Sequence, residues 1–298
     1  MHTPRSLLLC LLTLAACNDG GHRPPAQLDT GLAITTDIAL DVASAAYRTA
    51  FDPVRVTRVL TRIFDLPPSA SGPPASGQHT LEIEGPEGGN AVVTWQDRDG
   101  DSRYSTGDSF SIACADYGAD GLLLTGAATF SEVWISGTVP TGLTWIVTAQ
   151  LDLLGVTMRS GTNTTTLSGS YACHREQRAT VRLLELEATG PAAVGMRTLA
   201  AGSGAARNDY ALDFSQGLAA LGTLTDAELG GTLDFRTETL LTGIQVMPDP
   251  VAGRLVVEGA ANSCLWLVPL DFFTLELHVD ADGDGEAETV IPTEWSEL

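Results

Sequence analysis

Apolar and polar residues alternate with a period of two through much of the chain beyond residue 80. In the clearest run the apolar positions are Leu143, Trp145, Val147, Ala149, Leu151 and Leu153. Similar runs occur at 210–215 and 273–280, and turn-rich segments separate them. Strands with one buried and one wet face show this pattern, and they pair antiparallel. The alternation therefore predicts a mainly β fold over 81–298. It is either an antiparallel β-sandwich or a curved sheet or barrel, which could divide near 200–208.

A helical period replaces this alternation in the segment 34–65. Over 36–51 the apolar residues fall on one stripe, which predicts a short helix that Pro53 ends. The next stretch, 54–64, is again helical in pattern, although its β-branched residues also allow a strand. The stretch 66–80 is rich in Pro, Ser and Gly, so it predicts a linker between the helical segment and the β domain.

Four of the sixteen basic residues lie in the helical segment: Arg48, Arg55, Arg58 and Arg62. Two interpretations are open. The arginines could contact anionic lipid, or they could pair with acidic residues elsewhere in the chain. We favour internal pairing, because the chain carries a net charge of −21 and offers many carboxylates.

The first residues form a short polar start followed by an apolar run over 6–14. Such a run is too short to span a bilayer, but its length suits a signal peptide. It ends in Leu14-Ala15-Ala16-Cys17, which resembles the lipobox of bacterial lipoproteins. That resemblance implies removal of 1–16 and attachment of a diacylglycerol to the thiol of Cys17, followed by a flexible tether over 17–33. Because the residue after the cysteine is Asn18, it also implies an exported protein held in the cell envelope by its lipid, with the outer membrane favoured.

The acidic composition limits the partners of the chain. Nucleic-acid binding needs clustered cations, so the net charge of −21 argues against it, whereas the same charge suits cations. Beyond Cys17 the chain has three cysteines, Cys114, Cys173 and Cys264, and none of them has metal-finger spacing. Cys114 and Cys173 each share a strand face with apolar residues, so we expect them to point inward and form a disulfide. Cys264 would then remain a free thiol.

Two acidic stretches are the strongest candidates for chemistry. In the first, counting Asp97 as position one, oxygen-bearing side chains fall at positions one, three, five, nine and twelve: Asp97, Asp99, Asp101, Ser105 and Asp108. In the second, which begins at Asp280, acids follow in a similar order: Asp280, Asp282, Asp284, Glu286 and Glu288. Hard cations such as calcium are bound by six to eight oxygens from alternating positions of this kind.

Both stretches resemble the calcium loop of EF-hand and dockerin-like modules. The resemblance implies calcium as the ligand, and it covers about twenty residues. The first loop departs from the pattern because Ser102 replaces the glycine at position six and Asp108 is shorter than the usual glutamate at position twelve. The second loop has Gly285 at position six but Ile291 at position twelve. Strands are expected on both sides of each loop, where the family has helices. A plain hairpin turn with exposed acids is the alternative.

The sequence contains no nucleophile elbow, zinc-protease motif, phosphate loop or dinucleotide-binding glycine pattern. The leading hypothesis is therefore a non-enzymatic envelope lipoprotein, with a structural or binding role and calcium-stabilised loops. A second hypothesis is a carrier or sensor of apolar ligands, which requires an apolar cavity that the N-terminal helix could plug. A third is a hydrolase that uses two carboxylates about 5–10 Å apart across a groove.

Overall fold

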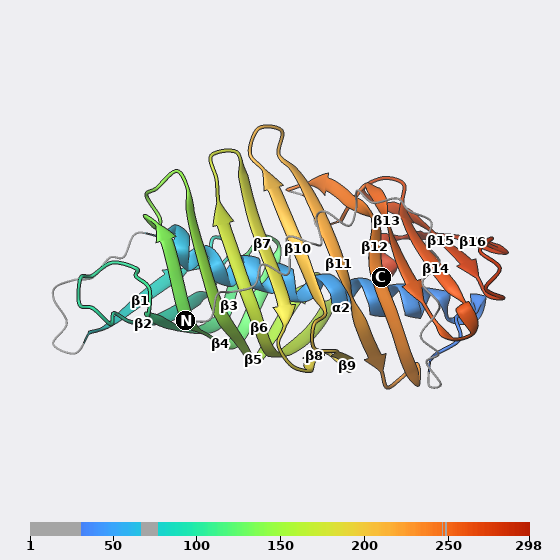
Figure 1. Cartoon of the computed structure of the whole chain (residues 1–298), viewed down its shortest axis with the longest axis horizontal. Coiled ribbons are helices and arrows are strands. Elements are labelled where there is room, and N and C mark those ends of the chain that lie inside the picture. The colour runs from blue at the N-terminus through green and yellow to red at the C-terminus, as the bar shows by residue number, and fades with distance from the viewer. Residues whose placement is uncertain (1–30, 67–76, 246, 248) are drawn as a thin grey trace.

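A computed structural model of the chain describes residues 31–66, 77–245, 247 and 249–298. It consists of one large antiparallel sheet that curves around a long helix (Figure 1). The prediction of a mainly β, antiparallel fold with an N-terminal helical segment is confirmed. Of the alternatives left open by the sequence, the structure is the curved sheet, because all sixteen strands belong to one sheet.

The strands follow one another as a meander, with β8 and β9 forming a side hairpin. Their bounds are β1 (Gln78–Glu84), β2 (Asn90–Gln96), β3 (Ser109–Ala119), β4 (Leu122–Gly137), β5 (Trp145–Ser160), β6 (Asn163–Gln177), β7 (Val181–Ala188), β8 (Ala192–Val194), β9 (Arg197–Leu199), β10 (Gly204–Tyr210), β11 (Ser215–Asp226), β12 (Gly231–Ile244), β13 (Ala252–Glu258), β14 (Cys264–Pro269), β15 (Thr274–Asp280) and β16 (Thr289–Glu294). The sheet continues through 200–208, because β10 pairs with both β7 and β11.

Successive hairpin turns of a meander alternate between the two ends of the strands. We call the end with the β2–β3, β4–β5, β6–β7, β10–β11, β12–β13 and β14–β15 turns the upper edge, after its place in Figure 1. The lower edge has the β1–β2, β3–β4, β5–β6, β11–β12, β13–β14 and β15–β16 turns. The N-terminal segment reaches the lower edge, where Gly31 bridges to Thr232 at the start of β12 and the Leu32 amide donates to the Thr232 carbonyl.

The helix α2 (Ala39–Leu60) runs along the concave face of the sheet and packs against β7, β10, β11 and β13–β15 (Figure 1). The short 3-10 helix η1 (Thr36–Ile38) precedes it and η2 (Thr61–Asp65) follows it. The expectation that Pro53 ends a first helix is wrong, because Pro53 lies inside α2. A proline inside a helix costs about 3 kcal/mol. Side chains on both sides of Pro53 are buried in the same core, and this burial offsets the cost.

Three of the four arginines of this segment pair with acids. Arg55 lies 3.0 Å from Asp249 and 3.6 Å from Asp52. The guanidinium of Arg58 lies 3.2 Å from Asp120 of the β3–β4 turn and 3.4 Å from Asp209 of β10, and Arg62 also pairs with Asp120. The internal pairing favoured from the sequence is thus confirmed for these three residues, and it ties the helix to both ends of the strands.

The expected disulfide between Cys114 and Cys173 is wrong. Both side chains are buried as expected, on β3 and β6, but both thiols are free, as is that of Cys264. Strands β4 and β5 lie between them in the sheet. With neighbouring strands about 4.8 Å apart, three spacings give about 14 Å, whereas a disulfide needs Cα atoms within about 7 Å. Burial raises the pKa of the Cys114 thiol to about 11 and that of Cys173 to about 12.

Candidate cation-binding loops

The two acidic stretches form loops at opposite edges of the sheet. The first connects β2 to β3 at the upper edge, and the second connects β15 to β16 at the lower edge. Strands flank both loops, as the alternation pattern indicated. Any ion held by one loop would therefore lie far from an ion held by the other, and each would join only its own pair of strands.

The first aspartate of each loop accepts the same two backbone hydrogen bonds. Oδ1 of Asp97 accepts from the Gly100 amide at 2.7 Å, and its Oδ2 accepts from the Ser102 amide at 2.8 Å. In the second loop, Oδ1 of Asp280 accepts from Gly283 at 2.7 Å and Oδ2 from Gly285 at 2.8 Å. Asp97 is 6% exposed and Asp280 is 2% exposed. Each buried carboxylate therefore holds the backbone of its loop through these two hydrogen bonds.

The aspartates at positions three and five also act alike in the two loops. Each accepts the amide two residues further on through Oδ1, at distances between 2.8 and 3.3 Å. These residues are Asp99 and Asp101 in the first loop and Asp282 and Asp284 in the second. Two stretches more than 180 residues apart along the chain thus adopt one hydrogen-bonding scheme.

The backbone explains how serine can stand at position six. Position four is a glycine with a positive φ in both loops, 74° at Gly100 and 77° at Gly283. At position six Gly285 has a φ of 92°, and Ser102 has a φ of 59°. A non-glycine residue in this left-handed region costs roughly 1–2 kcal/mol. The first loop keeps the geometry in spite of the substitution.

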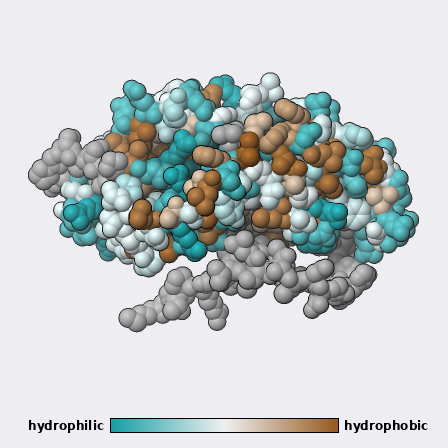
Figure 2. All heavy atoms as spheres, turned by 90° about the horizontal axis from the view of Figure 1, so that it is seen from above, coloured by the Kyte–Doolittle hydropathy of each residue, from teal (hydrophilic) through white to brown (hydrophobic). Residues whose placement is uncertain are grey.

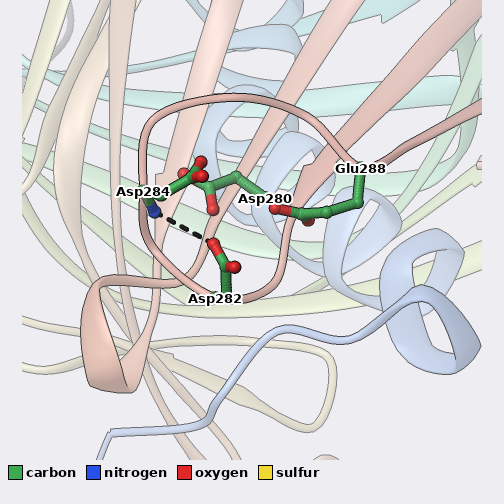
Figure 3. A group of neighbouring side chains, drawn as sticks. All are labelled: Asp280, Asp282, Asp284 and Glu288. Atoms are coloured by element: carbon green, nitrogen blue, oxygen red, sulfur yellow. Dashed lines mark hydrogen bonds between the residues drawn. The ribbon is translucent and has the colours of Figure 1, made fainter.

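The scheme turns the carboxylates inward. One carboxylate oxygen from each of Asp280, Asp282, Asp284 and Glu288 lies within 4.8 Å of the others, and Figure 3 shows these side chains converging inside the loop. In the first loop the same holds for Asp97, Asp99 and Asp101. Carboxylate oxygens gathered in this way are the ligands that hard cations prefer.

Two acids expected to be ligands, Asp108 and Glu286, lie outside these clusters. Asp108, 1% exposed, accepts hydrogen bonds from Trp95 Nε1 at 2.9 Å and from the amides of Arg98 and Ser105 at 3.0 and 2.9 Å. Ser105 also donates its hydroxyl to Asp108, at 3.2 Å. Asp108 and Ser105 therefore form hydrogen bonds at the end of the first loop, next to the strands β2 and β3. Glu286 likewise does not join the group formed by the other acids of the second loop.

The electrostatics of the two clusters differ. Burial alone would raise the pKa of Asp97, but the amides of Ser102 and Gly100 outweigh it and hold this pKa below its ordinary value. At Asp282 the amide of Asp284 lowers the pKa, yet desolvation and the charges of Asp284 and Glu288 together raise it. The second loop gathers four carboxylates and the first gathers three, so the second carries the more crowded negative charge, which a cation would relieve.

His79 is a neighbour of the first cluster that the sequence did not reveal. Its place in the stretch 66–80 predicts a linker residue, but β1 already begins at Gln78. Its ring stacks on Trp95 with centroids 4.4 Å apart. Its Nε2 lies 3.5 Å from Oδ2 of Asp97, and the His79 side chain is only 9% exposed. His79, Leu81 and Ile83 alternate along β1, and this pattern could have predicted that His79 lies on a strand and faces the same side as the two apolar residues.

The concave face offers little space for an apolar ligand. A pocket between α2 and the sheet, lined by Val54, Tyr171 and Phe235 among others, has a volume of about 10 Å³. An open depression of about 650 Å³ lies beyond the end of the helix. Two charged residues of its wall, Arg62 and Asp65, are already paired with Asp120 and Arg175 respectively.

Cys17 and the lipobox lie outside the described residues. Among the residues that the structure describes, no helix combines the length and the apolarity needed to cross a bilayer. Comparisons with protein-family models, with curated proteins and with solved structures found no match.

Proposed function

We propose that this chain is an exported, lipid-anchored protein of the cell envelope with a non-enzymatic structural or binding role, and that calcium stabilises the loops at the two edges of its sheet. The observation that supports the calcium part is the shared geometry of the two loops. Asp97 and Asp280 bind their loop amides in the same way, and each begins a cluster of converging carboxylates.

Charge repulsion gives the physical reason for a cation. At an effective dielectric near 20, two carboxylates about 4 Å apart repel by about 4 kcal/mol before ionic screening. The second loop gathers four such groups and the first gathers three. A divalent ion bound between the carboxylates would replace their mutual repulsion with attraction to the ion. Because strands flank both loops, the ion would fasten a hairpin, and we expect a stabiliser and not a conformational switch.

The lipid anchor is supported by the sequence alone, through the apolar run 6–14 and Leu14-Ala15-Ala16-Cys17. The start of the described chain is compatible with it, because Gly31 lies at the lower edge, beside the β11–β12 turn, and not in the core. A carrier of apolar ligands is less well supported, since α2 occupies the concave face where such a ligand would lie.

Calcium should raise the melting temperature of the protein. With affinities typical of extracellular calcium modules, roughly 10⁻⁴ to 10⁻³ M, each site contributes about 1.4 kcal/mol at ten times its dissociation constant. For a chain of this size that corresponds to a few degrees per site. The measurement is a melting curve in EDTA and in millimolar calcium.

The variants Asp99→Asn with Asp101→Asn, and Asp282→Asn with Asp284→Asn, should each lose part of this shift. Asp271→Asn is the matched control, because Asp271 also accepts turn amides, from Phe273 and Thr274, but lies outside both clusters. A melting temperature indifferent to calcium in the unchanged chain would reduce both loops to acidic turns.

A further inference from the structure

His79 of β1 points a buried ring nitrogen at the first acidic loop, and this nitrogen has no hydrogen-bond partner in the described part of the chain. In the β1–β2 ladder His79 lies opposite Trp95. The Asp97 amide donates to the Gly77 carbonyl at 2.7 Å, which extends the ladder by one pair. Asp97 is therefore the diagonal neighbour of His79 on the same face of the two strands. Nε2 of His79 lies 3.5 Å from Oδ2 of Asp97.

The ring of His79 is held in place by its neighbours. It stacks on the indole of Trp95, with ring centroids 4.4 Å apart and planes inclined by 21°. The indole is fixed in turn, because its Nε1 donates to Asp108 at 2.9 Å. The side chain of His79 is 9% exposed and that of Asp97 is 1% exposed. Both groups are thus positioned before any ion arrives, as the ligands of a metal site should be.

The separation of these two atoms suits ligands that share one ion. Hydrogen bonds between nitrogen and oxygen usually measure about 2.7–3.2 Å, so 3.5 Å is long for such a bond. Nitrogen and oxygen ligands of zinc each lie about 2.0–2.2 Å from the ion, and at a tetrahedral angle this places them about 3.3–3.6 Å apart. The observed distance between His79 and Asp97 falls in that range.

The donor set also distinguishes the first loop from the second. The group at the second loop consists of carboxylates alone. Calcium takes oxygen ligands, whereas an imidazole suits zinc, copper and nickel. A histidine nitrogen aimed at a buried carboxylate is therefore of no use to calcium, but it provides the ligand that a transition metal prefers.

An ion can reach this position from solvent. The loop lies at the upper edge, and Figure 2, which looks down on this edge, shows hydrophilic side chains at both ends of the molecule, one of which is formed by β1–β3. Asp99 and Asp101 are exposed, and an oxygen of each lies within 4.8 Å of an Asp97 oxygen. His79 is not a member of that group, so Asp97 is the link between the two. Water and the exposed carboxylates can supply the remaining ligands.

We propose that the first loop binds a divalent transition metal of the zinc type, with Nε2 of His79 and Oδ2 of Asp97 as its buried ligands. The proposal rests on the proposed function in that it concerns one of the same two loops, to which it adds a histidine ligand and a second class of ion. Calcium and the transition metal would compete for Asp97. The bound metal would tie β1, the edge strand of the sheet, to the β2–β3 loop.

Cobalt(II) is the probe, because it adopts the geometries of zinc and its visible absorption reports the ligands. The chain from residue 17 with Cys17→Ser, without a histidine tag, keeps all the described elements and is titrated with cobalt in the absence of calcium. We expect one site with the absorption of nitrogen and oxygen ligands. Among the indole N–H signals of the five tryptophans, paramagnetic broadening should begin with that of Trp95, whose ring stacks on His79. An intense charge-transfer band would instead show cobalt on a cysteine thiolate and overturn the proposal.

Replacement of His79 provides the decisive variants. His79→Phe keeps an aromatic ring beside Trp95 but removes the nitrogen, and it should weaken cobalt binding by about a hundredfold, since even residues that only support a metal ligand contribute about 10–100-fold. His79→Gln, which keeps a polar group in this place, should show a similar loss. His278→Gln is the matched control, because Nε2 of His278 also lies near a carboxylate, 2.9 Å from Glu276, but neither belongs to an acidic group of the described chain. It should leave cobalt binding unchanged.

Calcium titrations of the same proteins separate this proposal from the proposed function. His79→Phe should bind calcium as the parent chain does, because the carboxylates remain. Calcium binding together with cobalt binding that is absent, or that is indifferent to both His79 variants, would overturn the transition-metal site alone. Cobalt binding that depends on His79, without calcium binding at either loop, would contradict the proposed function alone. An equal loss of cobalt binding in His278→Gln would also overturn the assignment of His79.

Discussion

Replacement of Cys17 by Ser should abolish labelling of the protein by a fatty-acid analogue. A serine hydroxyl cannot take the place of the cysteine thiol in the thioether bond that the lipobox resemblance implies for Cys17. The covalent acyl chains would be lost, and each buried CH₂ of such a chain contributes about 0.8 kcal/mol to membrane binding. The protein should then leave the tightly bound membrane fraction.

Cys10→Ser is the matched control for this experiment, because Cys10 lies within the apolar run that the lipobox follows. Labelling and fractionation should match those of the unchanged chain. Labelling that persists in Cys17→Ser would show that the acyl group is attached elsewhere and would remove the basis for the anchor.

Replacement of Phe64 by Ala should lower the free energy of unfolding by about 3–5 kcal/mol, the range for loss of a buried phenylalanine. Phe64 is 1% exposed and joins η2 to the sheet. Its ring meets Phe110, Phe130 and Tyr104 edge-on, with centroids 5.2, 5.6 and 6.2 Å apart. Removal of the ring leaves a cavity at the centre of this cluster, which the fixed strands cannot close.

Urea denaturation measures this loss. Leu40→Ala is the control, since Leu40 lies on α2 but is 37% exposed, and its replacement should cost far less. If the two variants lost similar small amounts, α2 and η2 would not be held inside the sheet as the structure has them.

Most strands were predictable from the sequence, but their assembly was not. The run 210–215 was an exception: its alternation predicted a strand with a buried face, but Leu212 and Phe214 lie in the β10–β11 turn and are 82% and 66% exposed. Alternation along 143–153 predicts one buried and one solvent-facing side, and β5 shows that arrangement from Trp145 onward, whereas Leu143 lies in the β4–β5 turn and is 81% exposed. The same alternation would arise in a sandwich, because it records burial and not which strand lies next to which. The disulfide prediction failed for this reason. Cys114 and Cys173 do point inward, but the sequence pattern does not show that β4 and β5 lie between their strands.

The helix and the loops show what local patterns can and cannot determine. Pro53 is a local helix breaker, and only burial along the whole of α2 overrides it. In the loops, positions one, three and five came together as expected, because Asx hydrogen bonds form between near neighbours in sequence. Asp108 did not join them, because Trp95 on the facing strand offers its indole N–H. That partner is set by strand register, which the loop sequence does not contain.

The number of calcium ions bound per chain tests the central claim most directly. Calorimetric titration of the chain from residue 17 with Cys17→Ser should give two sites of extracellular-module affinity, roughly 10⁻⁴ to 10⁻³ M. Asp99→Asn with Asp101→Asn should leave only the site at the lower edge, and Asp282→Asn with Asp284→Asn should leave only the site at the upper edge. Absence of calcium binding, or two sites that survive both double substitutions, would contradict the assignment of the loops.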